Sequence, residues 1–123
     1  MENKIPIEQL VNRNLVSVSA GAKAGVASRL IADSNVDVLP VLEEGRLVGL
    51  IREESLKGRS EEPVNALMEK PLFVEKSQDV DYAIKYMLDH HISRVPVVDS
   101  AIGMKCIGTI SSSELLEAKK SQK

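Results

Sequence analysis

The polar groups best suited to chemistry lie together near the C-terminal end, in the stretch "GTISSSELL". Hydroxyl and N–H groups at the start of a helix, such as those of Ser111 to Ser113, can receive an anionic oxygen of a phosphate. The carboxylate of Glu114 can accept hydrogen bonds from hydroxyl groups. The same letters also describe an ordinary N-cap with an exposed first-turn glutamate, which the helix dipole favours. The stretch therefore predicts either a ligand-contacting helix start or a plain cap.

No other pattern in the sequence predicts catalysis. There is no Ser, His and Asp arrangement for nucleophilic attack and no glycine-rich phosphate loop. Cys106 is the single cysteine, which excludes an internal disulfide and a cysteine-based metal cluster. His90 and His91 follow Asp89, but adjacent side chains at a helix end point in different directions and more often form a C-terminal cap than a metal site. We therefore expect no catalytic residue, no metal ligand and no enzyme activity.

Composition narrows the class of protein further. The 123 residues are 43% hydrophobic and 28% charged, which is typical of one soluble globular domain or two small ones packed as a unit. The net charge is −2, and without a basic stripe or aromatic stacking platforms nucleic-acid binding is not expected. No apolar run approaches the roughly 20 residues that span a membrane. The N-terminus carries no signal-peptide pattern, so we expect a cytoplasmic location and no membrane contact.

The elements that position the polar residues occur twice along the chain. Pro40 matches Pro96 at an offset of 56 residues, and Gly49 matches Gly108 at an offset of 59. The larger offset arises because "EEGR" in the first half becomes "DSAIGMK" in the second, at a place where a loop is expected and insertions are tolerated. Recurrence in the same order indicates an internal repeat. We divide the chain into two repeats, residues 1–59 and residues 60–123.

Each repeat predicts the order β-α-β-β-α, and the fold class is α/β (α+β) with two pseudo-symmetric repeats packed as one module. Apolar runs rich in β-branched residues predict strands at 15–18, 38–42, 46–51, 72–74, 95–98 and 106–110. Apolar spacings of three and four predict a helix over Val80–Leu88, with Asp79 or Ser77 as its N-cap. Val26, Leu30 and Ile31 form a weaker helical pattern in the first repeat, and a closing helix is expected near 53–58 and 111–120.

The repeated phrases "VLPVLEEGRLVGLI" and "RVPVVDSAIGMKCIGTI" carry a resemblance to a known family. Two copies of the β-α-β-β-α unit with these phrases resemble a tandem cystathionine-β-synthase-type (CBS) domain pair, the Bateman module, and the resemblance covers nearly the whole chain. It implies two pseudo-symmetric clefts between the repeats and a sensor function. It also implies a regulatory ligand that contains adenosine: AMP, ADP, ATP, S-adenosylmethionine or an NAD-type compound. No covalent cofactor is expected.

The resemblance also implies roles for particular residues. Ser111 and Glu114 match the hydroxyl and the acid of the family pattern, in which the acid receives the ribose hydroxyls; the usual acid is Asp, so the glutamate here is one methylene longer. The expected ligand-binding residues are Val16, Asp37, Arg94, Pro96, Thr109, Ser111, Ser113 and Glu114.

The two repeats differ in the polar residues at matching positions. In the first repeat Arg52 stands in the place of Ser111, and Ser55 in the place of Glu114. The hydroxyl and the acid of the family's ribose-binding pattern are therefore both missing from that repeat. Arg94 matches a place where a basic residue faces phosphates, and we align Asp37 with it in the first repeat. Because Asp37 would repel a polyphosphate, AMP, an uncharged adenosine group or a sulfonium ligand is favoured over ATP, with AMP the first choice.

The resemblance implies assembly as well. We expect a homodimer formed through helices, and a regulated enzyme or transporter that the sequence does not identify. The alternative is a ligand-free interaction or dimerisation module. The ribose-binding residues that the first repeat lacks favour this alternative, whereas Arg94, Ser111 and Glu114 together favour ligand binding.

Overall fold

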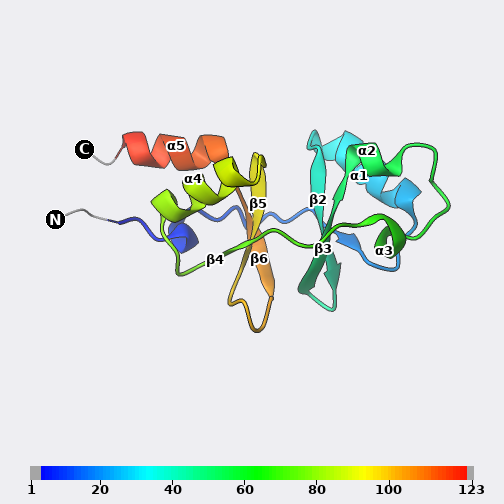
Figure 1. The fold of residues 1–123 in the computed structure, drawn as a ribbon, viewed down its shortest axis with the longest axis horizontal. Coiled ribbons are helices and arrows are strands. Elements are labelled where there is room, and N and C mark those ends of the chain that lie inside the picture. Colours follow the sequence, from blue (N-terminus) through cyan, green and yellow to red (C-terminus); the bar gives the residue numbers. More distant parts are fainter. Residues whose placement is uncertain (1–3, 122–123) are drawn as a thin grey trace. The chain divides into compact units, whose positions relative to one another are not determined.

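The computed structural model describes residues 4–121, which fold as two compact units (Figure 1). One unit is Val16–Leu72. The other combines the N-terminal segment up to Leu15 with the residues from Phe73 onward. The N-terminal segment therefore packs with the second repeat, so the division at residues 59 and 60 describes the sequence repeat and not the compact units. Within residues 4–121 no helix combines the length and the apolar character that crossing a membrane requires.

The Val16–Leu72 unit contains one three-stranded sheet and three helices. Its elements are β1 (Val18–Ser19), α1 (Ala24–Ser34), β2 (Val38–Glu43), β3 (Arg46–Arg52), α2 (Glu53–Leu56) and α3 (Val64–Leu67). The strand order is β1-β2-β3, with β1 parallel and β3 antiparallel to β2. Strands β2 and β3 are joined by a tight turn in which Glu44 and Gly45 both have positive φ, 52° and 79°. The helices of this unit lie on one face of its sheet (Figure 1).

The second unit repeats this arrangement. Its elements are the 3-10 helix η1 (Ile7–Leu10), β4 (Val74–Glu75), α4 (Val80–Asp89), β5 (Arg94–Val98), β6 (Cys106–Ser111) and α5 (Ser112–Lys120). The sheet order is β4-β5-β6, again with one parallel and one antiparallel pair. The connection from β5 to β6 is longer than its counterpart and is closed by Asp99, whose Oδ1 accepts from the N–H groups of Ser100 (2.7 Å) and Lys105 (3.0 Å).

Each unit has an aliphatic core, as the scarcity of aromatic residues predicts. In the Val16–Leu72 unit, apolar side chains of α1 and α3 pack on the sheet, and the buried cluster is Val18, Ala20, Ala24, Ala27, Ile31, Leu39, Val41, Ile51, Leu56 and Val64. In the second unit the buried apolar side chains include Ile7, Val74, Val80, Ala83, Met87, Ile92, Val95, Val97, Val98, Ile110 and Leu115. Ile7 comes from the N-terminal segment and has no exposed surface, so this segment is part of the core.

A crossing segment packs against a glycine in both units. In the second unit Asn12 pairs with Thr109 through two backbone hydrogen bonds, of 2.9 and 3.1 Å. A side chain on Gly108 would collide with Val11 and with the backbone of Asn12. In the Val16–Leu72 unit Glu69 pairs in the same way with Leu50, at 2.9 and 3.1 Å. The segment can approach the sheet because glycine has no Cβ.

The structure confirms the mixed α/β fold and most predicted elements, and it refines several details. Leu88, at the end of the apolar stripe of the predicted Val80–Leu88 helix, is 70% exposed, so this end of the stripe is not buried within the unit. Val26, in the weaker pattern of the first repeat, is 50% exposed, because it lies on the outer side of α1. The predicted closing helix of the first repeat, α2, has only four residues.

A further correction concerns register. Arg94 lies opposite Ser111 in the β5–β6 pair, and in the first repeat Val38 lies opposite Arg52. The counterpart of Arg94 is therefore the buried Val38 and not Asp37. Asp37 instead corresponds to Ser93, because the carbonyl oxygen of each accepts from the first N–H of the following helix, at 3.0 and 2.9 Å.

Candidate functional site

The candidate site is built around the start of α5, where strand β6 ends. Ser111 is the N-cap, as predicted: its backbone is extended, and its Oγ accepts from the N–H of Glu114 at 3.2 Å. The carboxylate of Glu114 turns back and accepts from the N–H of Ser111 at 3.0 Å. These reciprocal bonds form a capping box, which a Ser followed three residues later by Glu favours. The plain-cap interpretation is thus correct for the local structure. The bonds of the cap to the Glu114 carboxylate are made through Oε1.

Among the described residues, partners of the Glu114 carboxylate bond to one of its oxygens, Oε1. Its Oε1 accepts from both the N–H and the hydroxyl of Ser111, the latter at 2.9 Å. Within residues 4–121 no side chain or backbone group bonds to Oε2. Glu114 is exposed, whereas Ser111 is only 7% exposed. One carboxylate oxygen is therefore held and the other is available to a donor from solvent.

Strands β5 and β6 place a cation beside this cap. Arg94 lies opposite Ser111 in the strand pair, and its Nη1 donates to Oγ1 of Thr109 at 3.5 Å. Thr109 is 7% exposed, and Pro96, its cross-strand partner, is buried. Thr109 and Pro96 therefore form a buried pair next to Arg94 on the two strands. Arg94 is half-buried, and its guanidinium carries further N–H donors besides the one that bonds to Thr109.

A shallow groove of about 680 Å³ runs beside Glu114 in the same unit. Helix α5 and the N-terminal 3-10 helix η1 form its walls, and the lining residues are Gln9, Leu10, Ser113, Glu114, Glu117, Ala118 and Ser121. The residues at 114, 117, 118 and 121 recur at helical spacing, so one face of α5 lines the groove. Gln9, Leu10 and Glu117 were not predicted as site residues; in the repeat Leu10 matches Leu67, but this match does not itself indicate a site.

The corresponding place in the Val16–Leu72 unit is occupied by an ion pair. Nε of Arg52 donates to Oε2 of Glu69 at 2.8 Å. This hydrogen bond raises the pKa of Arg52, which burial lowers and the charges of Glu69, Glu54 and Asp37 raise further. Arg52 is thus held by an acidic partner within the same unit. Ser55, in the place of Glu114, is half-buried.

The eight predicted ligand-binding residues are divided between the two units. Arg94, Pro96, Thr109, Ser111, Ser113 and Glu114 all belong to the unit that contains α5. Val16 and Asp37 belong to the Val16–Leu72 unit, where Val16 packs on the buried cluster and Asp37 is exposed. A shared site for both groups stays a prediction.

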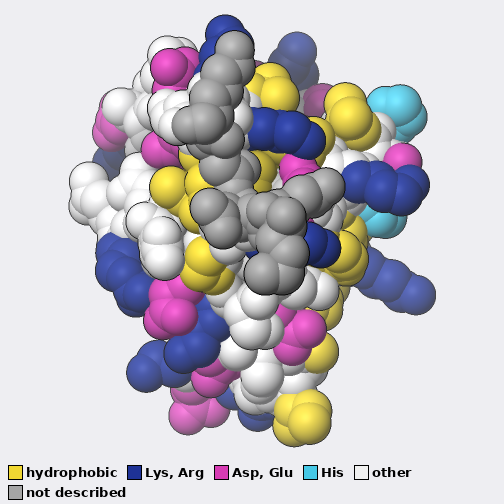
Figure 2. All heavy atoms as spheres, turned by 90° about the vertical axis from the view of Figure 1, so that its left-hand side faces the viewer, with side chains coloured by type: hydrophobic (Ala, Val, Ile, Leu, Met, Phe, Trp, Pro, Cys, Tyr) yellow, Lys and Arg dark blue, Asp and Glu magenta, His cyan; other side chains and the backbone are white. Residues whose placement is uncertain are grey.

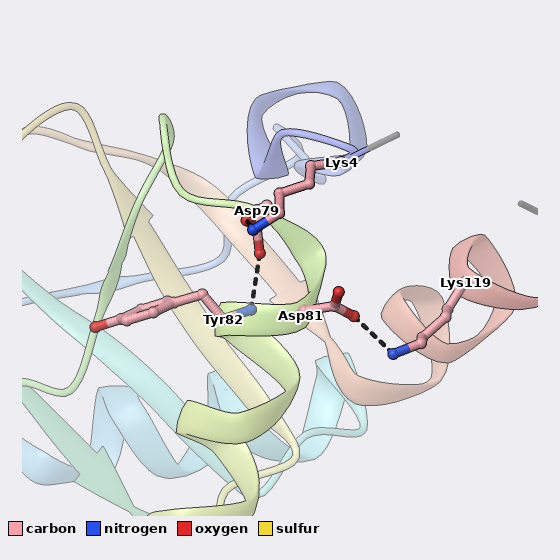
Figure 3. Close-up of polar contacts among 5 residues, drawn as sticks. All are labelled: Lys4, Asp79, Asp81, Tyr82 and Lys119. Atoms are coloured by element: carbon pink, nitrogen blue, oxygen red, sulfur yellow. Dashed lines mark hydrogen bonds and ion pairs between the residues drawn. The ribbon is translucent and has the colours of Figure 1, made fainter. Parts of the chain in front are cut away.

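Two acidic residues at the start of α4 are paired with lysines. Asp79 caps α4 by accepting from the N–H of Tyr82 at 2.9 Å and lies 3.6 Å from Nζ of Lys4 (Figure 3). Asp81 accepts from Nζ of Lys119 at 2.7 Å and so ties α4 to α5 (Figure 3). On the described part of the face seen in Figure 2, basic and acidic side chains are interspersed. This pattern differs from the continuous basic surface that nucleic acids require.

The histidines show no sign of metal coordination in the described part of the chain. Among residues 4–121 no group of three or more His, Cys, Asp or Glu side chains is arranged to hold a metal ion. His90 is the C-cap residue of α4 and packs against Tyr86, with 4.3 Å between ring centroids. His91 follows with a positive φ of 52°, which ends the helix.

The match to a known family recurs in each half of the chain, as the internal repeat does. The family model of the CBS domain matches the chain twice, over residues 7–62 and residues 64–121. Together the two matches cover almost the whole sequence.

Two relatives illustrate how such sequences occur in other proteins. The chain is similar to the uncharacterized protein YlbB of Bacillus subtilis (strain 168), with 32% identity over 94 residues that cover 67% of this chain and 64% of YlbB. It is similar to inosine-5'-monophosphate dehydrogenase of Thermoplasma acidophilum, with 26% identity over 117 residues that cover 92% of this chain and 23% of that enzyme. The chain thus spans less than two thirds of the length of either relative.

Among solved structures, the fold is similar to that of the CBS-pair protein CBSX2 from Arabidopsis thaliana. The TM-score is 0.84 at 23% identity, over 97% of this chain and 96% of that one. For CBSX2 in complex with AMP the TM-score is 0.81 at 25% identity, over 95% and 97% of the two chains.

Proposed function

Because the chain belongs to the CBS domain family, we propose that it is a regulatory module that binds an adenosine-containing ligand, with AMP as the first choice, and is not itself an enzyme. The site would be built around Glu114, at the start of α5. The regulated partner would be an enzyme or a transporter, and a cytoplasmic location belongs to the same proposal.

One observation carries this proposal: the half-engaged carboxylate of Glu114. Oε1 is held by Ser111 at 2.9 and 3.0 Å, and among the described residues nothing bonds to Oε2. A carboxylate oxygen accepts two hydrogen bonds, and a ribose offers two neighbouring hydroxyl groups. The charge of the acceptor makes such bonds stronger than those between neutral groups.

The charge near the site supports a ligand with one phosphate. Arg94, the cross-strand neighbour of Ser111, supplies one guanidinium, and a guanidinium matches the geometry of one phosphate group. The N–H groups at the start of α5 add a weak positive potential. Glu114 and Glu117 both line the groove, so a longer polyphosphate would meet two carboxylates. Asp37 no longer supports this preference, because Val38 and not Asp37 is the counterpart of Arg94 in the first repeat.

Relatives provide independent support for AMP. CBSX2, at 25% identity, has been crystallised with AMP. Its fold covers 95% of this chain, so the same class of ligand is a reasonable first choice here.

Binding is tested by calorimetry with AMP, ADP, ATP, S-adenosylmethionine and NADH. We expect AMP to bind the wild type, and Glu114→Ala to weaken binding at least tenfold, since a lost hydrogen bond to a charged group costs about 1.5–3 kcal/mol. Ser55→Ala is the matched control, because Ser55 is the repeat counterpart of Glu114. Saturation at a hundredfold excess over the Kd should add about 2.7 kcal/mol of stability. Flat titrations for all five compounds would refute the nucleotide proposal.

The exposed apolar residues favour a second element of the proposal, a homodimer. Leu88 on α4 is 70% exposed and Leu116 on α5 is 50% exposed, and these two helices pack together. We propose that a second copy covers this surface. Light scattering at tens of micromolar should show a dimer, Leu88→Asp should give a monomer, and Ile102→Asp, at a 91% exposed loop position, should leave the dimer intact. A dimer that binds no adenosine compound would indicate the alternative function, a ligand-free interaction module.

A further inference from the structure

Ser111 holds the carboxylate of Glu114 with both of its hydrogen-bond donors. The backbone N–H donates to Oε1 at 3.0 Å and the hydroxyl donates to the same oxygen at 2.9 Å. Two short bonds to one oxygen fill its two lone pairs and fix the rotation of the carboxylate. Oε2 is thereby held on the side away from Ser111.

The hydroxyl of Ser111 has no capacity left for a ligand. It donates to Glu114, accepts from the N–H of Glu114 at 3.2 Å, and lies 3.2 Å from Oγ of Ser113. A hydroxyl has one donor and two lone pairs, so these three partners saturate it. Ser111 is also only 7% exposed. A ligand could bond to this hydroxyl only by breaking the capping box.

The length of the glutamate makes this arrangement possible. A capping box needs the side chain three residues after the N-cap to reach back to the N-cap N–H, which Glu does readily. The methylene that distinguishes Glu from Asp therefore lets Glu114 bond to Ser111 and stand at the groove edge at once.

We propose that Ser111 is a positioning residue, which does not contact the ligand but orients Glu114 so that Oε2 faces a ribose hydroxyl. This inference rests on the proposed function, because it assumes an adenosine ligand at Glu114. Loss of the Ser111 hydroxyl leaves the carboxylate charged but free to rotate. The variant should then lose affinity together with discrimination between ribose and deoxyribose.

A double-mutant cycle separates positioning from direct contact. The variants are Ser111→Ala, Glu114→Gln and their combination, titrated with AMP, 2′-deoxy-AMP and 3′-deoxy-AMP. Ser111→Thr retains the hydroxyl and tests rescue. Ser112→Ala is the control at the same helix start, since no side-chain hydrogen bond of Ser112 occurs among residues 4–121. Melting temperatures show whether every variant is folded.

We expect Glu114→Gln to weaken AMP binding about tenfold and Ser111→Ala about threefold to tenfold. In the Glu114→Gln background, Ser111→Ala should add less than about twofold, because residues that act through one group are not additive. The preference for AMP over the better of the two deoxy compounds should fall toward one in Ser111→Ala and return in Ser111→Thr. Additive losses, or an unchanged preference in Ser111→Ala, would overturn the proposal.

A measurement without ligand distinguishes this proposal from the proposed function. Amide hydrogen exchange at residue 111 reports the bond from its N–H to Oε1 of Glu114. Exchange should accelerate in Glu114→Ala, and also in Ser111→Ala if the hydroxyl is what holds the carboxylate. Exchange that stays slow in Ser111→Ala would refute the positioning role even if AMP binds. Accelerated exchange in both variants, with no binding of any adenosine compound, would support the positioning of Glu114 and refute the proposed function alone.

Discussion

The contact between Gly108 and the N-terminal segment can be tested by adding a single methyl group. In Gly108→Ala the new Cβ would lie 2.5 Å from Cγ1 of Val11 and 3.0 Å from the carbonyl carbon of Asn12, and closer still to the carbonyl oxygen of Asn12. Backbone atoms cannot turn aside as a side chain can. The Val11–Asn12 segment must therefore move away from strand β6.

The cost follows from two contributions. Overpacking a well-filled place typically costs about 1–3 kcal/mol. Displacing the segment also breaks the two backbone hydrogen bonds between Asn12 and Thr109, each worth about 0.5–1.5 kcal/mol. We expect a total of about 2–6 kcal/mol. With an unfolding entropy of about 2.1 cal/mol/K per residue, or about 0.26 kcal/mol/K for this chain, Tm should fall by about 8–23 °C.

Thermal and urea unfolding of three alanine variants provide the test. Gly21→Ala is the control, because no heavy atom lies within 4 Å of its Cβ position. Gly49→Ala should be intermediate, since its Cβ would meet Sδ of Met68 at 2.6 Å, which can move, and the carbonyl oxygen of Glu69 at 2.9 Å, which cannot move as freely. If Gly108→Ala melts within about 2 °C of Gly21→Ala, the N-terminal segment does not rest on Gly108 as described.

Three further predictions concern the second unit. Asp79→Ala should lose about 1 kcal/mol more than Asp81→Ala by urea unfolding, because both changes remove an ion pair but only Asp79 caps a helix; equal losses would contradict the cap. Leu115→Ala should cost about 2–5 kcal/mol and Leu116→Ala much less, since Leu115 is fully buried and Leu116 is 50% exposed. Burial raises the pKa of the Cys106 thiol above its ordinary value of 9.0, so the unfolded state ionises first and stability should fall as pH rises through that value. Urea unfolding between pH 7 and pH 10 should show a shallower fall in Cys106→Ala, and an identical fall would contradict the argument.

Local patterns were sufficient to predict most strands and the two longer C-terminal helices. The β-branched runs around Pro40 and Pro96 correspond to β2 and β5. Asp79 and Ser111 cap α4 and α5 as predicted, because capping depends on residues three positions apart. The capping box at Glu114 follows from the same short pattern.

Features that depend on distant contacts were not predictable from the sequence. The short helices η1 and α3 are too brief for a periodic pattern, and they form where the segments that contain them pack on a sheet. Periodicity showed that one side of α4 is apolar, but it could not show that Leu88 lies uncovered. The alignment of Asp37 with Arg94 was wrong by one residue, and in a strand such a shift moves a side chain to the opposite face.

The packing of the N-terminal segment on the second repeat has a consequence for synthesis on the ribosome. Ile7 and Asn12 leave the exit tunnel early, but the strand that Asn12 pairs with ends at Ser111. At about 5–20 residues per second, the ribosome needs roughly 5–20 s to make the intervening hundred or so residues. The Val16–Leu72 unit can fold in this interval, while the residues that bury Ile7 in the second unit are still being made. The segment around Ile7 and Asn12 is therefore made before the Val16–Leu72 unit but reaches its native contacts after that unit can fold.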